Sequence, residues 1–371
     1  MKKFKLIMSA VVLVSSTMFI QAQAADTIKV AIAGPLTGPV TQYGEMQKIG
    51  GLQAIDDVNS AGGVLGKKLE AVLYDDVCEP KQAVTIANKI ANDGIKFVLG
   101  HLCSGSTQPA SEVYDDEQIL MITAASTSPA ITEQGFNLIF RTIGLDDQQG
   151  PTAAKFILDK VKPSNVAVIH DKQRYGQGVA VAVKDDLTKA GLKPVLFEGV
   201  NKDQKDFSAL ITKMKKAKVD FVYYGGYHPE LGLILRQSRN LGFDADFMGP
   251  EGIGNKSISE VAGEASEGIY ITLPADFSQS EANAKIVENI KAKKQDPSGP
   301  FVLTSYAAVQ VLAEAMNATK STDPVEVAAY MRKNSFETPI GPVGFNEKGD
   351  LTEFEFVVFE WHKDATKTRV K

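Results

Sequence analysis

Short β-rich runs alternate with helical patterns along almost the whole chain, and this alternation restricts the possible fold more than any other feature. The helical segments are amphipathic, as in Phe207, Leu210, Ile211 and Met214, an i, i+3, i+4, i+7 stripe with Asp206 as its expected N-cap. Strand and helix alternating over this length predict an α/β fold, with parallel sheets covered by helices on both faces. The runs expected as strands are Ile28–Ile32, Leu69–Tyr74, Phe97–Leu99, Ile119–Thr123, Val166–Ile169, Pro194–Phe197, Phe221–Tyr224, Phe247–Gly249 and Ile269–Thr272.

The alternation falls into two blocks, which predicts two doubly wound lobes. The first block ends near Arg141–Leu145, and the second begins with the helix after Asp146 and ends near Leu273–Pro274. The remainder is too small to fold alone and must pack onto the earlier blocks. It holds two expected helices, about Ser305–Ala318 and Pro324–Lys333, a Gly/Pro-rich turn and a strand-like tail, Phe354–Trp361. Two lobes joined by several crossings would hinge and leave a cleft between them.

The first 24 residues have the pattern of a secretory signal. Lys2, Lys3 and Lys5 precede an apolar run that ends at Ile20, and small residues around Ala22 and Ala24 follow. The apolar run is too short to remain across a bilayer. We expect cleavage after Ala24 and no membrane insertion of the exported chain.

Composition limits the partners of the exported chain. Cleavage would leave 347 of the 371 residues and remove three basic residues and no acidic ones, so the net charge would fall from −5 to −8. Dispersed negative charge disfavours binding to nucleic acid or to an anionic membrane. No low-complexity segment or short repeat indicates disorder or a solenoid.

The two cysteines, Cys78 and Cys103, are expected to form one disulfide in an oxidising compartment. Such a bridge would stabilise the fold by about 3 kcal/mol on the chain-entropy model; the alternative is a pair of buried thiols. A zinc site is not expected, because His101 near Cys103 is accompanied by no CxxC or HxxxH motif. The four histidines are scattered, and each is interpreted as a loop or sheet-edge residue.

Residues that leave the strands carry the candidate chemistry, because ligands of parallel α/β sheets bind beyond the carboxyl ends of the strands. The first block supplies hydroxyls there, among them Ser104 and Thr127, and the second supplies Tyr175, Tyr227 and one carboxylate, Glu251. Hydroxyls and amides at a helix start suit a carboxylate, a buried acid suits an ammonium, and rings cover an aliphatic tail. The set therefore favours a zwitterionic amino acid.

Each of these residues also has a plain structural interpretation. Ser104 alone could be an N-cap, a tyrosine after a strand could be core, and Glu251 alone could lie on the surface. Glu230, a nearby acid, is assigned to a helix surface. Only the convergence of the set at equivalent strand ends favours a binding site.

Enzyme motifs are missing from the chain. No G-x-S-x-G, G-x-G-x-x-G or G-x-x-x-x-G-K-[ST] sequence occurs, and no cofactor or metal is expected. A hydrolase using Ser104 remains the alternative from another class, but no histidine is an evident base for it.

Four long stretches are similar to those of a known family: Tyr74–Ala83, Gly100–Ser104, Asp220–Glu230 and Phe247–Gly252. With them the whole exported chain resembles the periplasmic leucine/isoleucine/valine-binding proteins of Gram-negative bacteria. The resemblance implies a type I periplasmic binding fold with three crossovers and a ligand in the cleft between the lobes. It also implies lobes formed by 25–145 with 275–354 and by 146–274 with 355–371.

The resemblance implies a function in transport rather than catalysis. The expected protein is a periplasmic monomer that captures leucine, isoleucine or valine and delivers it to the permease of an inner-membrane ABC transporter. A related cleft protein for another small amino acid or amide is the alternative within the same class.

The resemblance also implies which residues of this chain form the binding site. Ser104, Thr127 and Ala125 would hold the carboxylate and part of the ammonium, and Glu251 would hold the ammonium. The positions that would line the rest of the pocket are Tyr43, Leu102, Cys103, Asp146, Tyr175, Tyr227 and Phe301. Ser126 stands where the family often has alanine, and a side chain pointing inward there would alter ligand preference.

Overall fold

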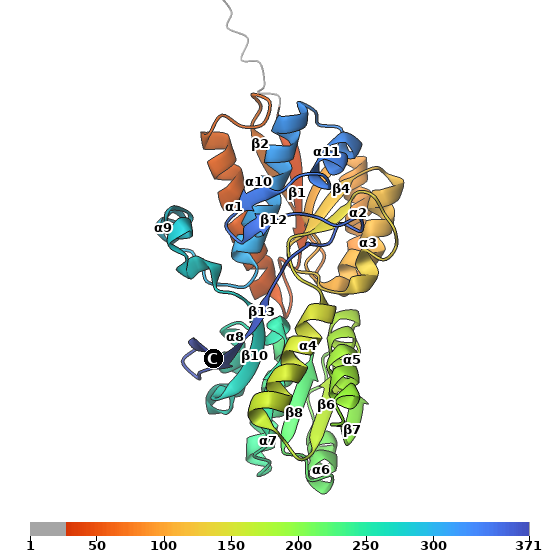
Figure 1. Ribbon diagram of the computed structural model, residues 1–371, viewed down its shortest axis with the longest axis vertical. Coiled ribbons are helices and arrows are strands. Elements are labelled where there is room, and N and C mark those ends of the chain that lie inside the picture. The colour runs from red at the N-terminus through yellow and green to blue at the C-terminus, as the bar shows by residue number, and fades with distance from the viewer. Residues whose placement is uncertain (1–26, 371) are drawn as a thin grey trace, which may run out of the picture.

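The computed structural model describes residues 27–370, which form two lobes stacked along the long axis of the molecule (Figure 1). The expected signal segment lies outside the described residues. Every run expected as a strand forms one, with ends shifted by only a few residues. The α/β prediction is confirmed, and the chain passes between the lobes three times: after β5, after β10 and before β13.

The first lobe is built on a five-stranded parallel sheet with the order β2-β1-β3-β4-β5. Its strands are β1 (Ile28–Gly34), β2 (Leu69–Asp75), β3 (Phe97–Gly100), β4 (Leu120–Thr123) and β5 (Ile139–Arg141). The three-residue strand β5 was not predicted from the sequence. The helices of this lobe are α1 (Thr41–Ser60), α2 (Pro80–Asn92), α3 (Ser104–Asp116), α9 (Ala284–Ala292), α10 (Val302–Thr319) and α11 (Pro324–Met331).

The second lobe is built on a seven-stranded sheet with the order β14-β13-β10-β9-β8-β6-β7. Its strands are β6 (Val166–His170), β7 (Leu196–Gly199), β8 (Phe221–Gly225), β9 (Asp246–Gly249), β10 (Ile269–Pro274), β13 (Phe356–Trp361) and β14 (Lys367–Arg369). The helices are α4 (Asp146–Phe156), α5 (Arg174–Lys189), α6 (Ser208–Lys216), α7 (His228–Asn240) and α8 (Ser257–Ala262). Strands β6 to β10 are paired parallel, as predicted, and β13, which returns from the first lobe, extends this sheet by pairing antiparallel with β10, with β14 folded back on it.

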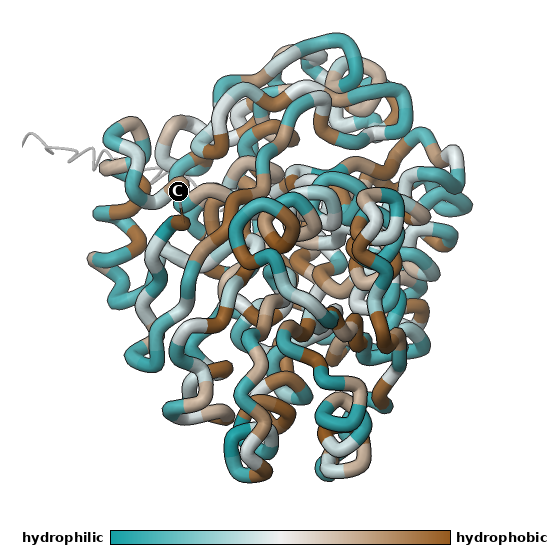
Figure 2. The backbone as a smooth tube through the Cα atoms, turned by 60° about the horizontal axis from the view of Figure 1, so that its bottom comes forward, coloured by the Kyte–Doolittle hydropathy of each residue, from teal (hydrophilic) through white to brown (hydrophobic). Residues whose placement is uncertain are grey.

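Alternating side chains give each sheet two buried faces. In β1, Val30 and Ile32 face the core beneath α1 and α10, whereas Ala31 and Ala33 face the core beneath α2 and α3. In β6, Val168 and Ile169 likewise enter different cores. Along the helices of Figure 2, hydrophobic and hydrophilic residues alternate, as amphipathic segments require.

The amphipathic stripe predicted on α6 is confirmed, since all four of its apolar residues are buried. Asp206 lies one residue before the N-cap position, which Phe207 occupies, so the expected cap was wrong by one. The Asp206 carboxylate still accepts the N–H of Ser208 at 2.9 Å.

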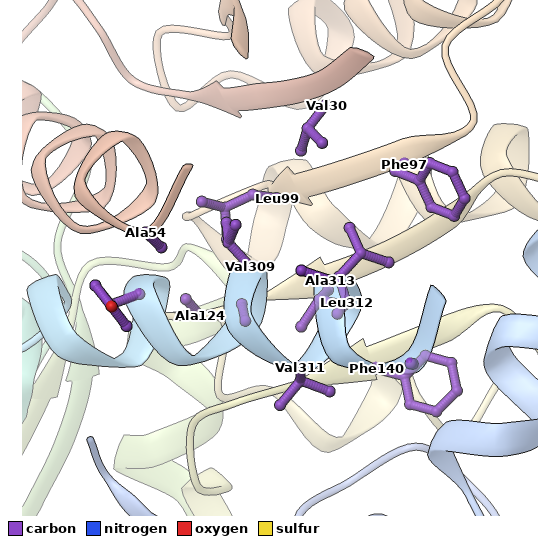
Figure 3. Packing of buried hydrophobic residues seen from close by; sticks show 14 of the residues in the cluster. Val30, Ala54, Phe97, Leu99, Ala124, Phe140, Val309, Val311, Leu312 and Ala313 are labelled. Carbon is purple, nitrogen blue, oxygen red and sulfur yellow. The ribbon is translucent and has the colours of Figure 1, made fainter. Parts of the chain in front are cut away.

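Helix α10 is the central support of the first lobe. It is apolar on most sides and lies across the sheet, with Val309, Leu312 and Ala313 near Leu99 (Figure 3). It also packs closely against α1, because a Cβ at Gly50 would lie 1.9 Å from the carbonyl oxygen of Val302. Within residues 27–370, none of the helices has the length and apolarity that a bilayer crossing demands.

Candidate functional site

The expected site residues come together where the two lobes meet. All twelve have exposed fractions between 0% and 6%: Tyr43, Leu102, Cys103, Ser104, Ala125, Ser126, Thr127, Asp146, Tyr175, Tyr227, Glu251 and Phe301. Seven of them belong to one apolar cluster that includes residues of both lobes: Tyr43, Leu102, Cys103, Ala125, Tyr175, Tyr227 and Phe301. Segments far apart in the chain therefore form one enclosed region beyond the carboxyl ends of the strands.

The first-lobe half of this region is the start of α3. Cys103 is at the N-cap position, so Ser104 is the first helical residue and is not the cap considered from the sequence. The Ser104 hydroxyl accepts the backbone N–H of Ser128 at 3.4 Å. The free amides and the positive end of the helix dipole at this terminus suit an anion such as a carboxylate.

A disulfide joins this helix start to the loop after β2. Cys78 and Cys103 are bonded with their Cα atoms 5.6 Å apart, which confirms the predicted bridge. The residue next to Ser104 is therefore covalently fixed to a second segment of the first lobe.

His101 lies in the loop between β3 and α3, as expected, but its side chain is buried. It is fully buried, with Nδ1 2.6 Å from Asp76 Oδ2 and Nε2 2.8 Å from the Tyr114 hydroxyl. Among the other histidines, His362 also lies in a loop, whereas His170 ends the internal strand β6 and His228 begins α7, so these two are not the loop or sheet-edge residues expected. Because both ring nitrogens of His101 are occupied, it is not free to act as a base for Ser104.

The loop after β4 carries Ser126 and Thr127. The Ser126 hydroxyl lies 2.5 Å from that of Thr107 and donates to the Leu102 carbonyl at 2.8 Å, so it is used within the lobe. The Thr127 hydroxyl is buried and has no partner of standard geometry among the described residues. The Thr127 hydroxyl therefore lies close to the Asp146 carboxylate without a hydrogen bond of standard geometry.

Glu251 is the buried acid of the second-lobe half. It begins a short 3-10 helix after β9 and accepts a hydrogen bond from the Gln149 amide. Burial and the nearby Asp146 carboxylate raise the pKa of Glu251 to about 8, although Gln149 and Tyr175 oppose the shift. Gln149, on α4, was not identified from the sequence, and no local pattern distinguishes it.

Asp146, at the start of α4, is a second buried acid in the same region. Neither carboxylate oxygen has a partner of standard geometry among the described residues. Burial raises the pKa of Asp146 to about 7, partly opposed by the Thr127 hydroxyl and Arg141. Two acids without a matching cation form a site that favours a positively charged group, because an unpaired buried charge is costly.

Aromatic rings from both lobes pack against one another in the same buried region. The Tyr43 ring lies 5.5 Å from that of Phe301 and 6.4 Å from that of Tyr227, which in turn lies 5.2 Å from Tyr175. The Tyr175 hydroxyl accepts the N–H of Gly252 at 2.9 Å and so fixes the turn that carries Glu251.

The two lobes are in contact at the mouth of the cleft between them. Lys202 of the second lobe pairs with Glu79 of the first. A cavity of about 530 Å³ lies beside this pair, lined by Cys103, Tyr175, Tyr227 and neighbouring residues. This arrangement corresponds to a closed cleft.

Glu230 is not on a helix surface, contrary to the sequence-based assignment. It is 4% exposed and accepts the N–H of Asp203 at 2.8 Å. Burial raises the pKa of Glu230. Over residues 27–370, no group of three or more His, Cys, Asp or Glu side chains is arranged to hold a metal ion.

Two lobes, three crossings and a buried polar site between them define the class of this protein. A family model described as "Periplasmic binding protein" matches residues 27–366, and the chain belongs to this family.

Relatives and solved structures agree with this assignment. The chain is 58% identical over 350 residues to a leucine-, isoleucine-, valine-, threonine- and alanine-binding protein of Pseudomonas aeruginosa, covering 94% of both chains. It is 56% identical over 347 residues to the Leu/Ile/Val-binding protein of Escherichia coli K12, again covering 94% of both. The crystal structure of a leucine binding protein from Thermotoga maritima is similar, with a TM-score of 0.86 and 26% identity over 93% of this chain and 98% of that one.

Proposed function

We propose that this protein is a substrate-binding protein that closes around leucine, isoleucine or valine and delivers it to an inner-membrane ABC importer. The observation that carries the proposal is the buried acid pair Asp146 and Glu251 opposite the start of α3, with an apolar cage between them. Such a site complements both charges and the aliphatic tail of one amino acid. The names of the similar proteins from P. aeruginosa and E. coli support the same ligands.

The carboxylate of the ligand would lie at the first lobe. Ser104 and Thr127 offer hydroxyls, and Ala125 lies in the same buried loop as Thr127. A helix start and hydroxyl donors bind a carboxylate by charge-assisted hydrogen bonds.

The ammonium of the ligand would lie against Glu251, with Asp146 adding negative potential. Ligand groups on both lobes mean that binding favours the closed state over the open one. Tyr43, Tyr175, Tyr227 and Phe301, with Leu102 and Cys103, would surround the side chain.

The remaining assignments belong to the same proposal. The lobes consist of 25–145 with 275–354 and of 146–274 with 355–371, and the protein acts as a monomer without catalysis. Export to the periplasm follows cleavage after Ala24, supported by the amino-terminal sequence pattern and by the family.

A thermal-shift screen of the twenty amino acids, followed by calorimetry, tests this function. A ligand that binds only the folded state raises the melting temperature. Leucine, isoleucine and valine should raise it most, and chromatography should recover leucine unchanged. Leucine should bind tighter than alanine by about 2 kcal/mol, roughly thirtyfold, at about 0.8 kcal/mol per buried methylene.

Lysine and glutamate should fail in the same screen, because their second charge would be buried without a partner. Stabilisation by no branched-chain amino acid, or tight binding of lysine or glutamate, would contradict the pocket assignment. Consumption of leucine would favour the hydrolase alternative.

A further inference from the structure

Arg141 is a fully buried cation directly behind the loop that carries Thr127. It ends β5, and its side chain makes no contact with solvent. Its guanidinium donates hydrogen bonds to four acceptors: the Ser126 carbonyl at 2.6 Å, the Ser128 carbonyl at 3.1 Å, the Thr132 hydroxyl at 2.8 Å and Asp350 Oδ1 at 2.7 Å. These hydrogen bonds restrict the guanidinium to one orientation, because its planar group of N–H donors matches several acceptors at once.

Asp350, the anionic partner of Arg141, arrives from the far end of the chain. The turn that carries it lies on β5: Arg141 N donates to the Gly349 carbonyl at 3.0 Å. Gly349 has φ +91°, and a Cβ there would lie 2.1 Å from the Ile139 carbonyl oxygen, so only glycine permits this approach. The Thr132 hydroxyl donates to Asp350 at 2.8 Å and closes the network.

The two carbonyls that Arg141 holds flank Thr127. Because a trans peptide is planar, fixing the Ser126 carbonyl toward the guanidinium directs the Thr127 N–H the opposite way. The same segment is fixed twice more: the Thr127 carbonyl accepts the N–H of Asp146 at 2.9 Å, and Ser128 N donates to Ser104. Arg141 therefore holds a segment whose hydrogen bonds reach Ser104 and Asp146, although Arg141 itself was not assigned to ligand binding.

We propose that Arg141, oriented by Asp350 and Thr132, is a positioning residue that holds Thr127 in the geometry required by the ligand carboxylate. The inference rests on the proposed function, since it concerns the same site. Arg141 acts through the loop, and its buried positive charge lies on the side where the ligand anion would bind. Asp350 therefore contributes to the affinity for leucine, although it is not one of the residues expected to line the cleft.

Thr132→Val is the sharpest test, because it removes one hydroxyl from the network and leaves both charges. Calorimetry with leucine should show at least a fivefold loss of affinity. Arg141→Lys, which keeps the charge but loses the fork, should show a larger loss. If Arg141→Lys does not fold, Thr132→Val answers the same question. The matched control is Thr319→Val, whose hydroxyl bonds to the Ala315 carbonyl at 2.9 Å on α10 and whose affinity should stay within twofold of the parent.

A double-mutant cycle separates positioning from a general effect on the fold. Thr127→Val and Thr132→Val should be non-additive, with the double variant losing clearly less than the product of the two single losses. Unchanged affinity in Thr132→Val, or losses that multiply independently, would overturn the inference alone. A parent protein that does not bind leucine would overturn the proposed function and this inference with it.

Discussion

The hydroxyl of Tyr43, on α1 of the first lobe, donates a hydrogen bond to the backbone carbonyl of Glu251 in the second lobe, at 3.5 Å. The two residues are separated by 208 positions in the sequence. Tyr43 is therefore both a candidate ligand-binding residue and a direct contact between the lobes. One side chain contributes to closure of the lobes and to enclosure of the ligand.

Tyr43→Phe should weaken leucine binding about two- to tenfold, because a typical net hydrogen bond contributes about 0.5–1.5 kcal/mol. Titration calorimetry measures the change, and small-angle scattering should show a less compact average without ligand. Tyr306→Phe is the matched control, since it removes a hydroxyl that bonds Asp57 at 3.0 Å within the first lobe. Equal affinities of Tyr43→Phe and the parent for leucine would show that the Tyr43 hydroxyl does not contribute to closure.

Glu251→Gln should cost about 2–5 kcal/mol of leucine affinity, the usual loss when one partner of a desolvated charge pair is removed. Folding should persist, because a buried acid without its cation does not stabilise the free protein. Glu230→Gln provides a matched control, since Glu230 is also buried but accepts a backbone N–H from Asp203. If Glu251→Gln binds leucine as the parent does, Glu251 is not the ammonium partner.

Leucine binding should release protons near neutral pH. In the closed cleft without ligand, the pKa of Glu251 is raised from 4.5 to about 8 and that of Asp146 from 3.8 to about 7, so the closed site holds protons that an ammonium would displace. Affinity should therefore rise from pH 6 to pH 8. Calorimetry in buffers of different ionisation enthalpy should give different apparent enthalpies, and Glu251→Gln should reduce the difference. A buffer-independent enthalpy would show that the acids are already ionised.

The same two pKa shifts fix the sign of the pH dependence of stability. The folded protein holds these protons more tightly than the unfolded chain, so their contribution to the free energy of unfolding is full below about pH 4. It is lost progressively as the pH rises through about 7 and 8. In Glu251→Gln, denaturant titrations of the free protein should show a smaller loss over this range, and a larger loss would contradict the assignment.

Replacing both Cys78 and Cys103 by alanine should lower the free energy of unfolding by about 2–5 kcal/mol, the usual cost of losing a native bridge. Leucine affinity should fall less, because α3 remains packed in the lobe. Denaturant unfolding with and without reductant measures the difference. Two free thiols in protein purified under oxidising conditions would show that the bridge does not form.

Local sequence patterns predicted the strands and placed the site at their carboxyl ends. Ser104 and Glu251 could be identified because parallel strands bring their carboxyl ends to one edge, so sequence position after a strand translates into location. Arg141 and Gln149 could not be found this way. Their partners Asp350 and Glu251 lie 209 and 102 positions away, and no short-range pattern encodes such pairs.

Burial of polar side chains was the other failure. Glu230 was assigned to a helix surface because charged groups are seldom buried without partners. It is buried because the Asp203 amide satisfies its carboxylate, and the loop residue His101 is likewise buried between Asp76 and Tyr114. The rule is sound, but its exceptions depend on contacts that only the folded chain reveals.

The chain returns to the first lobe after β10 and to the second lobe before β13, and this order has a consequence for biosynthesis. The first sheet lacks its central support until α10 is made, and the second sheet lacks a strand until β13 is made. Neither lobe can be completed on a nascent chain as a contiguous unit, although domains commonly fold in the order of their synthesis. The second lobe can be completed only after β13 has emerged, and loss of a carboxyl-terminal piece that includes β13 would leave the sheet of the second lobe unfinished although the segments of the first lobe had already been made.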